Sequence, residues 1–149
     1  MRPLGIYLHI PFCLSKCPYC DFYSVVYTQQ AARDYAEALV RAVKTSPARG
    51  SRVDSVYFGG GTPVLLGKEL LPILQAVAQS YELTDDCEIT LEANPAAMTY
   101  DTLCALRQGG FNRISMGVQS ANDRELQDLG RRHSFEYFLR ERKFLLNFS

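Results

Sequence analysis

The chain is poor in several features that mark particular classes of protein. It has no tryptophan, two histidines and 16 basic against 16 acidic residues, so its formal net charge is zero. Without a basic excess, the composition does not favour binding to nucleic acid or to an anionic membrane surface. No apolar run approaches the ~20 residues of a membrane-spanning helix, and the first residues resemble neither a signal peptide nor a transit peptide. We therefore expect a cytoplasmic protein without a membrane span.

The remaining composition is that of an ordinary globular protein. Of the 149 residues, 47% are hydrophobic and 21% are charged. This length suits a single domain with a buried core. The sequence therefore predicts a single domain whose candidate functional residues lie in a few short motifs.

The five cysteines are unevenly distributed, because three of them lie within eight residues. Cys13, Cys17 and Cys20 have C-x3-C-x2-C spacing, which differs from the evenly spaced, paired cysteines of a secreted disulfide framework. Thiolates in so short a loop are ligands for an iron–sulfur cluster or for zinc. Three ligands leave one iron of a four-iron cluster open to a small molecule, whereas a structural zinc site has four ligands. A zinc site completed by His9 or a distant cysteine, and free or disulfide-bonded thiols, are the alternatives.

Hydrophobic periodicity predicts strands that alternate with helices. Short apolar runs predict strands at 5–10, 53–58, 88–92 and 112–118. Amphipathic spacing predicts helices over 30–44 and 68–80, a third from an N-cap at Thr99 to Gly109, and a fourth opened by a capping box of Asn122 and Glu125. The side chains expected to face inward are Tyr35, Leu39, Ala42, Val43, Leu70, Leu71, Leu74, Val77, Ala78, Cys87, Leu103, Cys104, Leu106, Leu126 and Leu129.

This alternation predicts an α/β fold with a parallel sheet and helices packed outside it. About four βα units are present, which is too few to close a (β/α) barrel. We therefore expect a partial barrel whose sheet keeps an open edge.

Each predicted strand ends in residues suited to binding a ligand. The cysteine loop follows the first strand, Gly59-Gly60-Gly61-Thr62-Pro63 follows the second, Glu92 and Asn94 end the third, and Gln119-Ser120 follow the fourth. In parallel α/β folds, ligands bind where the strands end. The sequence therefore predicts one site built from all four strand ends.

The glycine run would let backbone N–H groups approach a ligand closely. It matches neither G-x-x-x-x-G-K-[ST] nor G-x-G-x-x-G, so we expect a carboxylate or an ammonium there, with a tight turn as the alternative. Glu92 would bind hydroxyls or an ammonium, and Gln119 and Arg131 would bracket a carboxylate. Taken singly, a strand-end glutamate such as Glu92 is more often solvated, Gln119 is more often a capping amide, and Arg131 is more often a surface arginine.

Five stretches together resemble the radical S-adenosylmethionine (AdoMet) superfamily. More narrowly, they resemble its oxygen-independent coproporphyrinogen III oxidase group, including the HemW-type haem-chaperone branch. The resemblance covers residues 4–134 in the same order as in the family. Its motifs are residues 5–13 leading into the cysteine loop, 57–63, 90–95, 112–120 and 129–134.

The resemblance implies that Cys13, Cys17 and Cys20 ligate a [4Fe–4S] cluster whose fourth iron takes the amino and carboxylate groups of AdoMet. An electron entering the cluster would cleave AdoMet to methionine and a 5′-deoxyadenosyl radical. The implied partners are AdoMet, haem or a porphyrin, and a reducing electron donor such as flavodoxin or ferredoxin.

The resemblance also implies an AdoMet pocket. Two tyrosines match positions that line it, four consecutive residues match the turn that contacts the methionine part through the backbone, and three polar side chains match further AdoMet-binding positions. In that order, these residues are Tyr7 and Tyr19; Gly59, Gly60, Gly61 and Thr62; and Glu92, Gln119 and Arg131.

Phe22 distinguishes the branches of this group. The decarboxylating oxidases typically have a further cysteine two residues after the third ligand, where this chain has Phe22. The sequence therefore looks more like the haem-chaperone branch, with the oxidase as the alternative. Outside the superfamily, a zinc-binding interaction module and a small electron-transfer protein remain as alternatives.

The resemblance fades after Ser134. Ala121 replaces a usual aromatic, and residues 135–149 form an amphipathic segment with Phe135, Phe138, Leu139 and Leu146 on one face. We therefore expect an N-terminal part of a radical AdoMet core at 1–134 and a divergent tail at 135–149. A premature stop or a frameshifted end would explain the tail and would impair turnover; alternatively, the tail helix covers the open sheet edge of a small protein.

Overall fold

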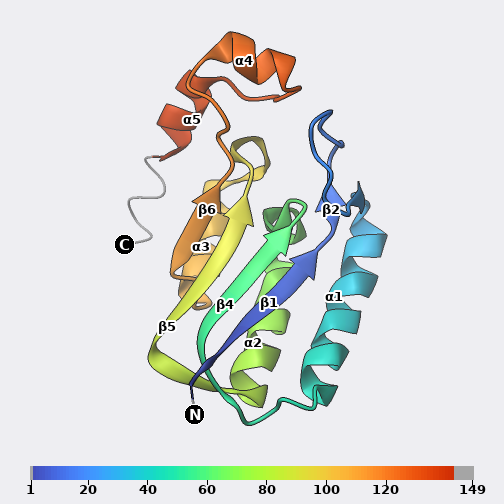
Figure 1. Ribbon diagram of the computed structural model, residues 1–149, viewed down its shortest axis with the longest axis vertical. Coiled ribbons are helices and arrows are strands. Elements are labelled where there is room, and N and C mark those ends of the chain that lie inside the picture. Colours follow the sequence, from blue (N-terminus) through green and yellow to red (C-terminus); the bar gives the residue numbers. More distant parts are fainter. Residues whose placement is uncertain (1, 143–149) are drawn as a thin grey trace.

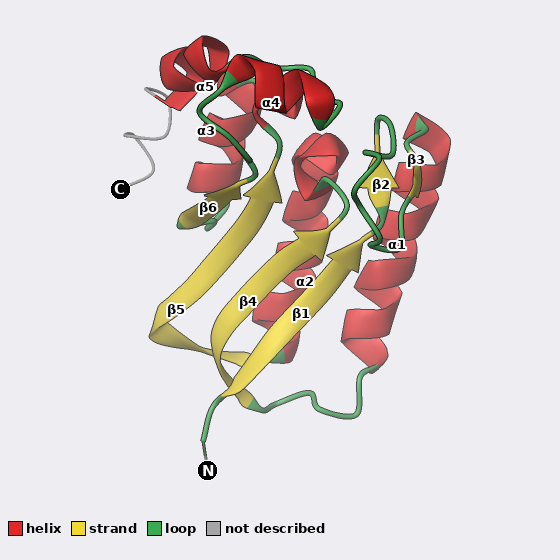
Figure 2. Cartoon of the chain, turned by 45° about the horizontal axis from the view of Figure 1, so that its top comes forward, coloured by secondary structure: helices red, strands yellow, loops and turns green. Residues whose placement is uncertain are grey.

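A computed structural model describes residues 2–142 of the chain. Within them, four parallel strands form one sheet in the order β1-β4-β5-β6 (Figure 1). A two-stranded parallel sheet, β2-β3, flanks the cysteine loop beyond the end of β1 (Figure 2). The strands are β1 Leu4–Ile10, β2 Phe12–Cys13, β3 Val25–Val26, β4 Arg52–Gly60, β5 Glu82–Ala93 and β6 Arg113–Met116.

The helices connect successive strands of the sheet and cover one of its faces. Figures 1 and 2 show α1, α2 and α3 behind the sheet, whose other face is bare. Strands that follow one another along the chain lie side by side in this sheet, and the helices cover only one of its faces. This is the arrangement found in part of a (β/α) barrel. The helices are α1 Gln29–Thr45, α2 Leu70–Ser80, α3 Tyr100–Gln108, α4 Asp123–Asp128 and α5 Phe135–Glu141, with 3₁₀ helices η1 Pro63–Glu69 and η2 Pro95–Ala97.

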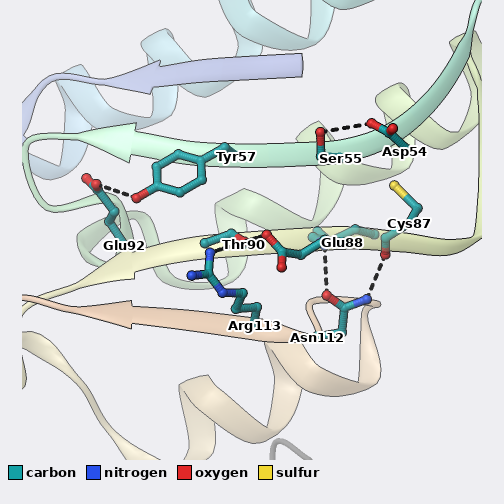
Figure 3. A network of polar contacts seen from close by, with 10 residues as sticks. Asp54, Ser55, Tyr57, Cys87, Glu88, Thr90, Glu92, Asn112 and Arg113 are labelled. Atoms are coloured by element: carbon teal, nitrogen blue, oxygen red, sulfur yellow. Dashed lines mark hydrogen bonds and ion pairs between the residues drawn. The ribbon is translucent and has the colours of Figure 1, made fainter. Parts of the chain in front are cut away.

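The two faces of the sheet differ in chemistry because side chains alternate along each strand. One row across the strands consists of Leu8, Phe58, Leu91 and Ile114, and it packs in the helix-covered core. The adjacent row consists of Tyr7, Tyr57, Thr90 and Arg113. The bare face is therefore polar and aromatic, as Figure 3 shows for part of it.

The predicted strands and their parallel order are confirmed, but some boundaries were wrong. β5 begins at Glu82 rather than at residue 88, because its polar first half pairs with Arg52 and Val53 before the register shifts. The second helix begins at Leu70 rather than at residue 68, because η1 precedes it and Gly67 breaks the helix with φ of 55°.

Several predicted inward positions were also wrong. Ala42 and Ala78 are exposed, and Leu129 and Cys104 are only half-buried. The buried faces of α1 and α2 instead include small or apolar side chains on the adjoining stripe. These are Ala32 and Ala36 in α1, and Ile73 and Ala76 in α2.

The caps of the third and fourth helices are confirmed, but the capping box is not. Thr99 Oγ1 accepts from Thr102 N–H at 3.3 Å, and Asn122 Oδ1 accepts from Arg124 N–H at 2.9 Å. Asn122 N–H donates to Ser120 Oγ at 3.0 Å, and this hydroxyl in turn donates to Glu125. Ser120 thus occupies the place that Glu125 would take in a reciprocal box.

The described part of the tail forms α5, which is capped by Ser134 Oγ accepting from Tyr137 N–H at 3.1 Å. Phe135 and Phe138 pack with ring centroids 5.9 Å apart, and α5 contacts η2. In Figure 1, α5 lies beyond the carboxyl end of β6 and not along that strand, so α5 does not cover the edge of the sheet. Leu146 lies outside the described residues, and the domain boundary at residue 134 remains a prediction.

Across residues 2–142, every helix is too short or too polar to cross a lipid bilayer.

Candidate functional site

Two adjoining cavities lie at the carboxyl ends of the strands, as the sequence predicted. The larger, of about 210 Å³, lies between the cysteine loop, the end of β4 and the 130–132 segment; the smaller, of about 160 Å³, extends along the ends of β5 and β6. The residues that border both cavities are Gly61, Thr62, Glu92, Asn94 and Arg131.

The three loop thiols border the larger cavity together. Cys13, Cys17 and Cys20 are free and half-buried, and Thr62 Oγ1 lies 3.8 Å from Cys13 Sγ. Cys20 N–H donates to Cys17 O at 3.1 Å, which forms a turn between these two thiols. Throughout residues 2–142, no three His, Cys, Asp or Glu side chains already converge closely enough to hold a metal ion. The donor set fits a thiolate-ligated centre in type, count and shared cavity, and binding would have to draw the thiols closer together.

His9, the first alternative for a fourth zinc ligand, has both ring nitrogens engaged elsewhere. Its Nδ1 lies 3.0 Å from Tyr7 Oη, and its Nε2 lies 3.2 Å from the carbonyl oxygen of Tyr23. Cys87 is buried in β5 and Cys104 lies on α3, away from the cavities. The geometry therefore does not support a zinc site completed by His9 or by either remaining cysteine.

The N–H groups at the end of the glycine run are not free, so the sequence interpretation was wrong for them. Three successive donors of the run, from Gly60, Gly61 and Thr62, are used within the chain. Their acceptors are Glu92 Oε2 at 3.0 Å, Ile10 O at 2.8 Å and Phe12 O at 2.7 Å, respectively. Any backbone contact of this turn with a ligand therefore falls to its carbonyl oxygens, which suit an ammonium and not a carboxylate.

Close packing explains why these positions are glycine. A Cβ on Gly59 would lie 2.7 Å from Tyr57 Cε1, and one on Gly60, whose φ is +117°, would lie 2.6 Å from His9 Cε1. A Cβ on Gly61 would lie 2.6 Å from the carbonyl oxygen of Phe12. Gly60 and Gly61 border the larger cavity, whereas Gly59 borders neither. The run thus seats the end of β4 against β1 and the start of the cysteine loop.

Glu92 is held in one orientation by the chain itself. Tyr57 Oη donates to its Oε1 at 2.7 Å (Figure 3), and Gly60 N–H donates to its Oε2 at 3.0 Å. Burial, followed by the hydrogen bond to Glu92, raises the pKa of Tyr57. Glu92 is therefore a fixed acceptor at the border of both cavities and not a freely solvated side chain.

Tyr57, which holds Glu92 by this hydrogen bond, was not among the residues that the sequence interpretation singled out. Within a strand it reads as an ordinary β-forming aromatic, and the available signal was its place two residues before the glycine run.

Arg131 and Tyr19 form a second pair at the border of the larger cavity. Arg131 Nη2 donates to Tyr19 Oη, and its guanidinium carbon lies 5.7 Å from the centre of the Tyr19 ring. Arg131 Nε is buried without a hydrogen-bond partner among the described residues. Burial raises the pKa of Tyr19, so the hydroxyl stays protonated. A half-buried guanidinium at the border of a cavity is suited to an anionic group such as a carboxylate.

Besides Gly59, the predicted site residues Tyr7 and Gln119 border neither cavity. Tyr7 lies in the middle of β1, is 57% exposed, and stacks on Tyr57 with ring centroids 6.1 Å apart. Gln119 is exposed and has φ of 74°, a backbone conformation that non-glycine residues seldom adopt. Gln119 and Arg131 nevertheless come close together beside Gly117. An ideal Cβ built on Gly117 would lie 3.0 Å from Gln119 Nε2 and 3.7 Å from Arg131 Nη2.

His133, for which the sequence offered no role, is buried next to Val118. Its Nε2 lies 3.3 Å from the carbonyl oxygen of Val118, and its Nδ1 has no partner among residues 2–142. Burial lowers the pKa of this imidazole below its usual 6.5, so the folded chain favours the neutral ring.

This shift predicts that acid weakens the fold. Because the folded chain holds His133 neutral, the unfolded chain binds more protons once the pH falls below about 6.5, and stability is lost from there downwards. Urea unfolding of the wild type and of His133→Gln at about pH 8 and about pH 5.5 measures this contribution. We expect the wild type to lose more stability between the two pH values than the variant. Equal losses would show that His133 does not carry the effect.

Comparisons with known proteins agree with this geometry. A sequence profile of the radical SAM superfamily matches residues 7–141. The chain is 41% identical over 137 residues to the heme chaperone HemW of Escherichia coli K12. The aligned region covers 89% of this chain and 36% of that protein. It is 37% identical over 142 residues to the oxygen-independent coproporphyrinogen III oxidase of the same strain, covering 93% and 31% of the two chains.

A solved structure has the same arrangement of elements. The coproporphyrinogen III oxidase HemN from Escherichia coli, described as a radical SAM enzyme, matches with a TM-score of 0.84 and 31% identity. The match covers 96% of this chain and 34% of that one. The chain thus spans about a third of the length of the relatives that it matches.

Proposed function

The chain belongs to the radical SAM superfamily, and from this membership we propose that its strand-end cavities form a joint site for a [4Fe–4S] cluster and AdoMet. Cys13, Cys17 and Cys20 would hold the cluster, because these three thiols border one cavity. The observation that carries the proposal is that the same cavity is bordered by a fixed carboxylate, Glu92, and by the guanidinium of the half-buried Arg131.

The polar groups of the cavity match the two charges of an amino-acid moiety. Glu92 provides a negative acceptor for an ammonium or for hydroxyls, and Arg131 provides a guanidinium donor for a carboxylate. Tyr19 holds the guanidinium from the side of the cysteine loop. A cluster with AdoMet supplies reductive radical chemistry when bound, and the residues of this chain bind, orient and enclose the two groups.

Within the superfamily, we propose that the chain is part of a haem chaperone of the HemW type. Phe22 supports this assignment, because it borders the larger cavity two residues after Cys20, where the oxidase branch would have a further thiol. Phe22 is 68% exposed and offers an apolar surface instead of a ligand. Haem would then be the cargo, and a small redox protein would supply the electron.

Anaerobic reconstitution with iron and sulfide, followed by EPR spectroscopy of the reduced chain with and without AdoMet, tests the shared site. We expect about four irons and four sulfides per chain and a spectrum that AdoMet perturbs. A four-iron cluster that ignores AdoMet would indicate an electron-transfer protein instead. Bound zinc without a cluster would overturn the proposal.

Assays with two tetrapyrroles separate the two branches. A haem chaperone should bind haem, observed as a shifted Soret band, and should not decarboxylate coproporphyrinogen III. Decarboxylation by the reconstituted chain, detected by mass spectrometry of the product, would assign it to the oxidase branch instead.

A further inference from the structure

The hydrogen bond between Tyr57 and Glu92 links a residue outside the cavities to one that borders both. Tyr57 pairs in register with Thr90, so Glu92 lies two residues further along β5, at the diagonal position that a long side chain reaches. Figure 3 shows the Tyr57 ring lying along the sheet with its hydroxyl directed at Glu92. The bond length is 2.7 Å, and Tyr57 itself borders neither cavity.

The ring of Tyr57 packs closely against Tyr7 and Gly59. Tyr7 stacks on it with an interplanar angle of 21°, and Gly59 leaves the space that a Cβ would take 2.7 Å from Tyr57 Cε1. Its hydroxyl is therefore delivered to one place. Because burial raises the pKa of Tyr57, the phenol remains a proton donor at neutral pH.

The carboxylate of Glu92 receives one donor on each oxygen. Gly60 N–H holds Oε2 at 3.0 Å, so the hydroxyl of Tyr57 on Oε1 fixes the remaining rotation of the carboxylate plane. Without that hydroxyl, the side chain would be free to turn about its last bond, and a ligand would have to order it on binding.

We propose that Tyr57 is a positioning residue that presents Glu92 to the amine or hydroxyl groups of AdoMet. The inference rests on the proposed function, because it assumes that AdoMet occupies the cavities. Tyr57 acts through Glu92 and does not contact the ligand. The hydroxyl preorganises the acceptor, so its removal should weaken AdoMet binding while cluster loading is retained.

A double-mutant cycle on the reconstituted chain tests the coupling. We expect Tyr57→Phe to weaken AdoMet binding about tenfold, the effect of losing one hydrogen bond to a charged group. Glu92→Ala should weaken binding more, and adding Tyr57→Phe to Glu92→Ala should change nothing further. Tyr81→Phe is the matched control, because Tyr81 follows α2 at the amino end of β5, away from the site. Iron content and thermal stability are measured for every variant.

The amide resonance of Gly60 gives a readout that does not depend on AdoMet. Since Gly60 N–H donates to Glu92 Oε2, its proton shift and hydrogen exchange report the orientation of the carboxylate. In the cluster-free full chain, we expect Tyr57→Phe to move this resonance and accelerate its exchange, and Tyr81→Phe to leave both unchanged.

The outcomes separate the two claims. Wild-type AdoMet affinity in Tyr57→Phe, or a further loss when it is combined with Glu92→Ala, would overturn the positioning role. A wild-type chain that loads a cluster and binds no AdoMet, with the Gly60 amide still responding to Tyr57→Phe, would overturn the AdoMet site and confirm the positioning of Glu92 alone.

Discussion

Replacing Cys17 by serine should abolish cluster binding. Cys17 lies between the other two thiols of the loop and borders the same cavity. A serine hydroxyl is not ionised at neutral pH and is a poor ligand for iron compared with a thiolate. Two remaining thiolates leave two irons of a four-iron cluster without protein ligands. Iron and sulfide in Cys17→Ser after anaerobic reconstitution should therefore fall to background, and the EPR signal should disappear.

Cys104→Ser is the matched control for this experiment. Cys104 is a free, half-buried thiol on α3 that borders neither cavity, so its variant should load iron as the wild type does. Full iron content in Cys17→Ser would contradict the assignment of the loop as the cluster ligands. Equal loss in both variants would show that iron binds through general thiol chemistry and not through the C-x3-C-x2-C loop.

Replacing Phe111 by alanine should cost about 3–5 kcal/mol of folding stability. Phe111 lies in the turn that joins α3 to β6 and is fully buried. Its ring packs on Phe58 of β4 with centroids 5.0 Å apart. The change removes a large apolar side chain and leaves a cavity. The surrounding sheet and helices are closely packed and relax only partly, so the cavity remains. Since domains of this size have about 5–15 kcal/mol in total, much of the chain should unfold under mild denaturant.

Chemical unfolding followed by circular dichroism measures this loss. Val26→Ala is the control, because Val26 is 70% exposed in β3 and its truncation should change stability by less than about 0.5 kcal/mol. A loss of less than about 1 kcal/mol for Phe111→Ala would mean that Phe111 is not packed as described.

The sequence alone determined the architecture and the place of the site. Periodicity identified the four strands of the main sheet, because apolar runs are bounded by proline, glycine and polar residues. Since parallel strands all end at one edge, the position of each polar stretch in the chain also predicted its position in space. The thiols and Arg131, 112 residues after Tyr19, accordingly border one cavity.

Boundaries and small side chains were less predictable. The first half of β5 carries acidic residues that hide its alternation, and alanines contribute little to an amphipathic pattern, so Ala42 and Ala78 were assigned to the wrong side. The reciprocal box at Asn122 failed because Ser120, two residues earlier, reached the same N–H. In each case neighbouring residues could take the same place in the structure, and the spacing of residues in the sequence does not decide between them.

Only the tertiary structure decided which polar groups remain available to a ligand. Three glycines suggested free N–H donors, yet the donors of Gly60, Gly61 and Thr62 are used by Glu92 and by the chain around β1. A glutamate at a strand end is commonly solvated, yet Glu92 accepts a hydrogen bond from Tyr57 on the neighbouring strand. A hydrogen bond between strands depends on register and side-chain direction, which arise only when the strands pair. The sequence thus determined which chemical groups meet at the sheet edge, and the paired strands determined which of them are already satisfied.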